Sequence, residues 1–206
     1  MSRVLISDFG GVLSSPLEAG FLAYQEESGV TLAELGRAMA GAAEEHGDQP
    51  LFQLERGEIT EAEFRARIEA HLERDFDLAR LIELSIKRVE SNTPMVEFVR
   101  ELRADGVRAA LLTNNVREWE SLWRSPLVDD LFEVVVVSAE VGLRKPDPAI
   151  YTLTLERLGD SVSAEDCVFV DDLEINCEAA RALGIQAVHF VDAEQAIPEI
   201  RSALSE

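Results

Sequence analysis

The sequence has little positive charge. Its 206 residues include 19 lysines and arginines against 40 aspartates and glutamates, which gives a formal net charge of -21. Because so acidic a surface repels phosphate backbones and anionic lipid headgroups, we expect no binding to nucleic acid or to a membrane surface. The same field also disfavours small anions, unless cationic side chains lie beside the site that binds them.

Disulfide motifs and long hydrophobic runs are also missing. The two cysteines, Cys167 and Cys177, form no C-x-x-C motif, and we expect them to be small buried residues in a reducing compartment. The N-terminus lacks the long apolar segment of a signal peptide, and no apolar stretch is long enough to span a bilayer. The sequence therefore predicts a cytoplasmic protein with no membrane partner. The sequence does not show whether the protein is a monomer or a homodimer.

Five short apolar runs predict the strands of a buried sheet. They are residues 3–7, 108–113, 133–138, 167–171 and 186–190. Each run is nearly continuous rather than alternating, which is typical of parallel strands buried on both faces. Helical segments with recognisable caps separate them, with Thr93 expected at one N-cap and Asp147 at another. The predicted fold class is α/β, with a doubly wound, Rossmann-like parallel sheet.

The long stretch between the first two strands has no strand pattern. It has the pattern of several helices, and the capping-box spacing of a threonine and a glutamate marks helix starts at Thr31 and Thr60. A simple crossover between strands needs far fewer residues. We therefore predict an α-helical cap domain at 16–90, inserted into a core domain that consists of residues 1–15 and 91–206.

Polar side chains follow the strands at the points where they end. In an open α/β sheet the carboxyl ends of the strands form the ligand-binding edge. The residues there are Asp8, Thr113, Asn114, Lys145, Asp171 and Asp172. Three carboxylates at close range repel one another strongly unless a cation is present. A hard divalent ion such as Mg²⁺ takes oxygen ligands and bridges to phosphate, so the pattern indicates phosphoryl transfer.

Each of these residue types has a role in such a site. Asp8 can be the nucleophile as well as a metal ligand. Thr113 can donate its hydroxyl to phosphate oxygens, and Lys145 would offset the repulsion between Asp8 and the phosphate. Gly10 and Gly11 would leave room for a phosphate to approach backbone N–H groups. Taken singly, each residue is more typical of a turn or an exposed surface, and only their shared position supports the site.

At these residues the sequence resembles the haloacid dehalogenase superfamily, in particular its phosphatase-like members with a small helical cap. The four motif segments are LISDFGGVL, LLTNN, GLRKPDPAIY and VFVDDLEIN, in the family's order. The segment ERGEITEAEF resembles a cap segment of the subgroup that includes the N-terminal phosphatase domain of soluble epoxide hydrolase and bacterial sugar-phosphate phosphatases.

The resemblance implies a Mg²⁺-dependent phosphatase that acts on a small phosphorylated metabolite through an aspartyl-phosphate intermediate. Asp8 would be the nucleophile, with Thr113 and Lys145 as the other catalytic residues. Gly10, Gly11 and Asn114 would help to bind the substrate. The ion would be held by Asp8, the backbone carbonyl of Gly10, and Asp171 or Asp172.

One position departs from the family pattern. The first motif usually has a second aspartate two residues after the nucleophile, which protonates the leaving group and then activates water. Here that residue is Gly10, and the loss of such a group typically costs about 10²–10⁴ in rate. Some relatives in the subgroup also have glycine, so we still expect an enzyme, one that favours good leaving groups. Glu55 and Glu58 are candidates for replacing the acid.

Two other interpretations stay open at this point. A metal-free haloacid dehalogenase also lacks the second aspartate, but adjacent Asp171 and Asp172 would be costly without a cation. A catalytically inactive binding protein that keeps the fold would explain the missing acid. It would not explain why Asp8, Thr113 and Lys145 are all present.

Overall fold

The computed structural model describes residues 3–16, 18–72, 74–124 and 126–205. Its five parallel strands form one sheet in the order β3-β2-β1-β4-β5. The strands are β1 (Val4–Ser7), β2 (Arg108–Thr113), β3 (Val134–Val137), β4 (Cys167–Asp171) and β5 (Gln186–His189). Each begins and ends within one residue of its predicted run, which confirms the doubly wound α/β fold.

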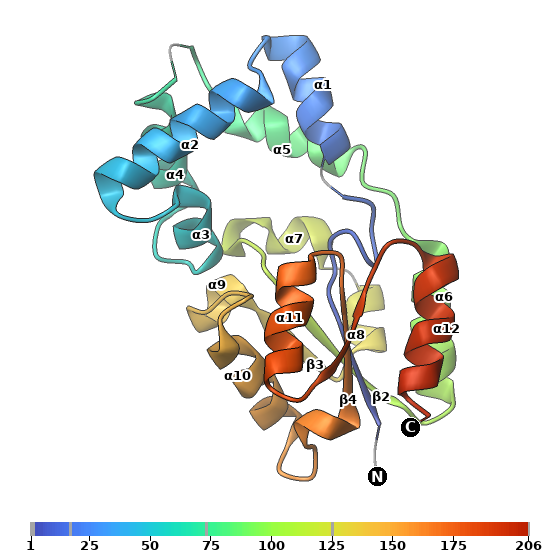
Figure 1. Ribbon diagram of the computed structural model, residues 1–206. Helices are drawn as coiled ribbons and strands as arrows, with labels where there is room; N and C mark the ends of the chain where they lie inside the picture. Colours follow the sequence, from blue (N-terminus) through green and yellow to red (C-terminus); the bar gives the residue numbers. More distant parts are fainter. Residues whose placement is uncertain (1–2, 17, 73, 125, 206) are drawn as a thin grey trace.

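Helices cover both faces of the sheet (Figure 1), which explains why the strands are continuously apolar. One face carries α6 (Thr93–Ala104), α8 (Pro126–Leu131) and α12 (Ala193–Ala203). The other carries α10 (Pro148–Leu158) and α11 (Glu174–Ala182). Successive side chains of β1 point to opposite faces of the sheet. Leu5 packs against the helices of the first face, and Val4 and Ile6 pack against those of the second.

Short helical turns complete the core. They are the 3₁₀ helices η1 (Arg117–Trp119) and η2 (Ala164–Asp166) and the α-helices α7 (Glu120–Trp123) and α9 (Ser138–Val141). Asp147 is the N-cap residue of α10, as predicted. The prediction for α6 was wrong by one residue, because Thr93 is already helical and Asn92 is the N-cap. The Asn92 amide group donates to the carbonyl of Val12 at 2.8 Å rather than capping the helix.

The inserted helices gather beyond one end of the sheet (Figure 1). They are α1 (Glu18–Ser28), α2 (Leu32–His46), α3 (Pro50–Glu55), α4 (Glu61–Glu69) and α5 (Leu78–Ile86). Both predicted capping boxes are present, at Thr31 and Thr60. These helices share a hydrophobic cluster of their own, to which Val116 is added from the core. The exact boundaries of a cap domain at 16–90 stay a prediction.

Two segments join the inserted helices to the core, and they lie side by side. The backbone N–H of Ser15 donates to the carbonyl of Glu90 at 2.8 Å, and the N–H of Glu90 donates to Ser15 Oγ at 3.0 Å. Two residues further along the second segment, the N–H of Asn92 donates to the carbonyl of Leu13 at 2.9 Å. The two connecting segments are therefore hydrogen-bonded to each other.

Both cysteines are buried and unpaired, as predicted. Burial raises the pKa of the Cys167 and Cys177 thiols to about 12, so neither forms a thiolate readily near neutral pH. Among the helices of the described residues, none combines the length and the apolar character that a membrane span requires.

Candidate active site

Three carboxylates come together at the carboxyl edge of the sheet. Asp8 follows β1, and Asp171 and Asp172 lie at the end of β4. One carboxylate oxygen from each lies within 4.8 Å of the others. The pairing register accounts for this, because β1 and β4 are neighbours with Ser7 opposite Val170. The structure thus brings together the acidic residues that the sequence placed at the strand ends.

Lys145 lies between two of these acids. Its Nζ atom is 2.8 Å from Asp8 Oδ1 and 2.5 Å from Asp171 Oδ2. The lysine is only 1 % exposed, so its charge has lost its hydration and depends on these partners. Burial alone would lower the pKa of Lys145, but the two carboxylates together outweigh it and the pKa is raised. Lys145 is therefore an ammonium group.

One ammonium group is too little positive charge for three acids. Burial raises the pKa of Asp8 to about 7; Lys145 opposes this rise and the charge of Asp171 adds to it. Burial also raises the pKa of Asp172, with a further contribution from Asp171. A divalent cation would supply the missing charge, and carboxylate oxygens are the ligands that Mg²⁺ prefers. The donor set therefore fits Mg²⁺.

Asp171 and Asp172 have different surroundings. Asp171 Oδ1 accepts from the N–H of Leu173 at 2.8 Å and from Asn176 Nδ2 at 2.9 Å, while Oδ2 accepts from Lys145. Asp172 instead lines the cavity described below. Asn176 is 2 % exposed, and sequence reasoning gave it no role. Its place on the first turn of the helix after Asp171 is the signal that could have identified it.

Asn114 fixes the loop that carries Lys145. Its Nδ2 donates to the Lys145 carbonyl at 3.0 Å, and its Oδ1 accepts from the Lys145 N–H at 2.8 Å. The backbone of Asn115 exchanges two similar bonds with Ser138 Oγ, at 2.9 and 3.1 Å. Thr113, buried at the end of β2, lines the same cavity as Asn114. The side-chain amide of Asn114 thus positions Lys145, a task that the sequence did not reveal.

The two glycines of the first motif have different neighbours. Gly11 has φ +80°, and a Cβ atom there would lie 2.2 Å from Asp172 Oδ2. Glycine at 11 therefore lets the Asp172 carboxylate approach the backbone, and the room for a phosphate beside this loop stays a prediction. A Cβ atom at Gly10 would meet no heavy atom within 4 Å. The open space beside this loop is at Gly10.

A cavity of about 560 Å³ lies above the acids, between the core and the inserted helices. Asp8, Gly10, Thr113, Lys145 and Asp172 are among the residues that line its polar side. Helices α1, α3 and α5 line the opposite side. The insert therefore forms one wall of the candidate site, and a ligand that fills this cavity would lie between the insert and the core.

Of the two glutamates considered as substitutes for the missing acid, only Glu55 lines this cavity. Its Oε2 lies 2.8 Å from Nε of Arg144, and both side chains are largely buried. Burial raises the pKa of Glu55, and Arg144 opposes the rise. Glu58 is bound instead to Arg56, whose hydrogen bond lowers the pKa of that carboxyl.

Comparisons with known proteins identify relatives across nearly the whole chain. A sequence model of the protein family described as "haloacid dehalogenase-like hydrolase" matches residues 3–184. The chain is 31% identical to the phosphorylated carbohydrates phosphatase of Thermotoga maritima over 195 residues, which cover 92% of this chain and 85% of that protein. It is 27% identical to the bifunctional epoxide hydrolase 2 of Rattus norvegicus over 216 residues, 96% of this chain. The chain spans only 38% of the length of that relative. It spans 19% of the length of another relative, the acyl-CoA dehydrogenase family member 10 of Mus musculus.

A solved structure shares this architecture. The haloacid dehalogenase family enzyme of Bacteroides thetaiotaomicron, in complex with magnesium and inorganic phosphate, superimposes with a TM-score of 0.68 at 25% identity. The superposition covers 91% of this chain and 93% of that one. A structure of the same fold thus binds the ion and the anion that the donor set described above would suit.

Proposed function

Because this chain belongs to the haloacid dehalogenase-like hydrolase family, we propose that it is a Mg²⁺-dependent phosphatase acting on a small phosphorylated metabolite. The observation that carries the proposal is the cluster of three carboxylates, within 4.8 Å of one another, beside the buried ammonium group of Lys145. The phosphatase name of the Thermotoga relative and the magnesium and phosphate in the Bacteroides structure support it.

In this proposal Asp8 is the nucleophile. Its carboxylate oxygen attacks phosphorus, a new P–O bond forms, and the P–O bond to the leaving group breaks. The leaving oxygen takes a proton from water, since Gly10 has no acid to offer. Water then attacks the phosphorus of the aspartyl phosphate, which releases inorganic phosphate and restores Asp8. Lys145 stabilises the negative charge next to Asp8 throughout.

The remaining residues bind the phosphoryl group and the ion. Thr113 and the backbone N–H groups of Gly10, Gly11 and Asn114 would donate to phosphoryl oxygens. Asp172, Asp8 and the Gly10 carbonyl would hold Mg²⁺, because both oxygens of Asp171 already accept from other groups. When bound, the ion neutralises phosphate charge and orients the group for attack. The inserted helices would exclude water from the site when they close over it.

Removal of the divalent ion tests the proposal. With Mg²⁺, we expect a panel of aryl, acyl, sugar and nucleotide phosphates to include substrates that release inorganic phosphate. EDTA should reduce this release to the background rate, because the acids then lack their counter-charge, and added Mg²⁺ should restore it. Halide release from 2-haloacids in EDTA would instead indicate a dehalogenase. No turnover of any of these compounds would indicate an inactive binding protein.

A second test concerns the missing acid. We expect Gly10→Asp to raise the turnover of alkyl phosphates by about 10²–10⁴, because the new carboxyl can protonate a poor leaving group. Aryl phosphates, whose leaving groups need little help, should gain much less. A Cβ atom at Gly10 would meet no heavy atom within 4 Å, so the first atom of the new side chain causes no clash.

Gly10→Asn is the matched control, since asparagine has nearly the same shape without the acid. Wild-type protein that handles alkyl and aryl esters equally well would contradict this interpretation of Gly10. So would an equal gain from the asparagine variant.

A further inference from the structure

The side of the cavity that faces the catalytic carboxylates is apolar. Helices α1, α3 and α5 contribute to this apolar wall, whose residues are Phe21, Leu51, Leu78, Leu81, Ile82 and Ile86. From the core side, Phe9, Trp119 and Trp123 extend it, and the rings of Phe9 and Trp123 pack with centroids 5.4 Å apart. Beyond the phosphate position, a ligand would therefore meet mostly hydrocarbon.

The inserted helices offer few polar groups to a ligand. Within the described part of residues 18–86, the polar residues that line the cavity are Glu55 and Ser85. Ser85 Oγ donates to the carbonyl of Leu81 in its own helix at 2.8 Å, and Glu55 is paired with Arg144. The Arg144 guanidinium in turn lies 3.8 Å from the centre of the Phe52 ring. A sugar would leave hydroxyl groups without partners against this wall, which is costly for binding.

Exposed apolar side chains mark the same cavity. Ile86 is 39% exposed and Leu173 is 54% exposed, and both line it. Apolar residues exposed next to a binding site are commonly covered when the ligand binds. In a chain with a net charge of -21, which repels anions, apolar contact would supply affinity that long-range electrostatics does not.

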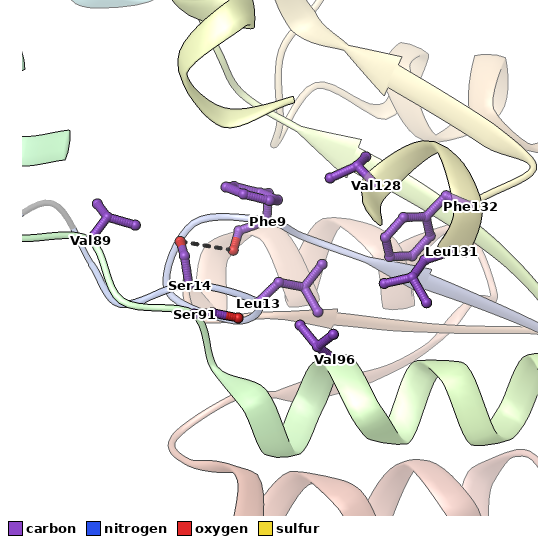
Figure 2. A pocket seen from close by; sticks show the side chains of 9 residues that line it. All are labelled: Phe9, Leu13, Ser14, Val89, Ser91, Val96, Val128, Leu131 and Phe132. Carbon is purple, nitrogen blue, oxygen red and sulfur yellow. Dashed lines mark hydrogen bonds between the residues drawn. The ribbon is translucent and has the colours of Figure 1, made fainter. Parts of the chain in front are cut away.

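A second, smaller cavity of about 170 Å³ adds to this apolar surface (Figure 2). It shares Phe9, Ser14 and Val89 with the larger cavity. On its far side Leu13 and Leu131 point toward each other. A long apolar group that passes Phe9 would meet further hydrocarbon there.

We propose that the substrate is a monophosphate ester whose alcohol or phenol carries a hydrocarbon body. The phosphate lies at Asp8 and Lys145, and the hydrocarbon lies against the apolar wall. This inference rests on the phosphatase function proposed above and specifies its substrate class. Sugar phosphates of similar size are poor substrates, because the wall leaves their hydroxyl groups unpaired.

A series of 4-alkylphenyl phosphates tests the substrate class, because the para-alkyl chain hardly changes the acidity of the phenol. From phenyl to 4-butylphenyl to 4-octylphenyl phosphate, we expect kcat/KM to rise by about threefold per methylene until the chain fills the cavity. Glucose 6-phosphate should be hydrolysed much more slowly than any of them. A flat series, with hydrolysis present, overturns the apolar substrate class alone. No hydrolysis of any ester overturns the phosphatase proposal itself.

Binding can be measured without turnover, because the chain has two tryptophans and both line the cavity. Butylphosphonate and octylphosphonate have a C–P bond that the proposed chemistry does not break. In Mg²⁺, we expect octylphosphonate to shift tryptophan emission and to bind about 100-fold more tightly than butylphosphonate, which is four methylenes at about threefold each. Equal affinity of the two would overturn the proposal.

Two matched variants locate the hydrocarbon. Ile86→Gln should weaken octylphosphonate binding by about tenfold and leave butylphosphonate binding much less affected. Leu32→Gln is the control, because Leu32 is similarly exposed, at 46%, and lies outside the cavity lining. Both positions are on the surface, so both variants should fold. Equal effects of the two variants would overturn the assignment of the apolar wall.

Discussion

Replacement of Asp8 with asparagine is expected to lower kcat for an aryl phosphate by about four orders of magnitude or more. The amide keeps the shape of the side chain and can still accept a hydrogen bond from Lys145, but it is not a nucleophile toward phosphorus. Without the attack there is no aspartyl phosphate. Steady-state phosphate release measures the loss, and the intact mass of acid-quenched protein shows whether the phosphorylated species forms.

The stability of this variant provides a second result. Burial raises the pKa of Asp8 to about 7, which means that its charged form is poorly accommodated in the absence of metal. We therefore expect Asp8→Asn to unfold at a denaturant concentration no lower than wild type in metal-free buffer. Asp160→Asn, at an exposed position, is the control and should keep full activity. Activity of Asp8→Asn close to that of wild type would exclude Asp8 as the nucleophile.

Lys145→Met should have the largest effect on stability. Methionine has a similar length, but it leaves Asp8 and Asp171 facing each other without the ammonium group that now contacts both. Breaking a buried ion pair on one side typically costs about 3–5 kcal/mol, and we expect a loss of that size in the free energy of unfolding. Activity should also fall sharply, because nothing would offset the repulsion between Asp8 and the phosphate. Urea denaturation in EDTA measures the stability.

The chain contains its own control for this variant. Lys87 is the other lysine of the sequence, and it pairs with Glu83 on the surface, where its side chain is 60% exposed. Lys87→Met should change stability by less than about 1 kcal/mol. Mg²⁺ should recover part of the Lys145→Met loss, since the ion supplies positive charge to the same acids. Similar losses for both lysine variants would contradict a special role for Lys145.

The positions of the acids followed from the sequence for a simple physical reason. A strand buried on both faces leaves a nearly continuous apolar run, and the polar residues where the run stops mark the carboxyl end of the strand. In a parallel sheet all these ends lie at the same edge, so Asp8, Thr113 and Asp171 had to lie on one side of the molecule. Their distances also depend on strand order, and β1 lies between β2 and β4.

Contacts between the insert and the core could not be obtained in this way. Glu55 and Arg144 are 89 residues apart, and Glu55 lies on α3, a helix of six residues that is too short to show a period. The apolar wall was hidden for a different reason. Periodicity marks the apolar face of α5, but Leu81 on that face contributes both to the hydrophobic cluster of the insert and to the cavity. Only the packing shows which apolar residues a ligand can reach.

The two segments that connect the insert to the core, around Ser15 and Glu90, restrict how the site can open. Ser15 and Glu90 are hydrogen-bonded to each other, so we expect the two segments that connect the insert to the core to move together. Helix α3, which ends at Glu55 and so carries one partner of the Glu55–Arg144 ion pair, lies at the other side of the boundary from these segments (Figure 1). If the inserted helices rotate about these connecting segments, the widest gap forms at the opposite side, where the Glu55–Arg144 ion pair separates. Long hydrocarbon bodies would enter and leave there, so the strength of one ion pair would help to set the rate of product release.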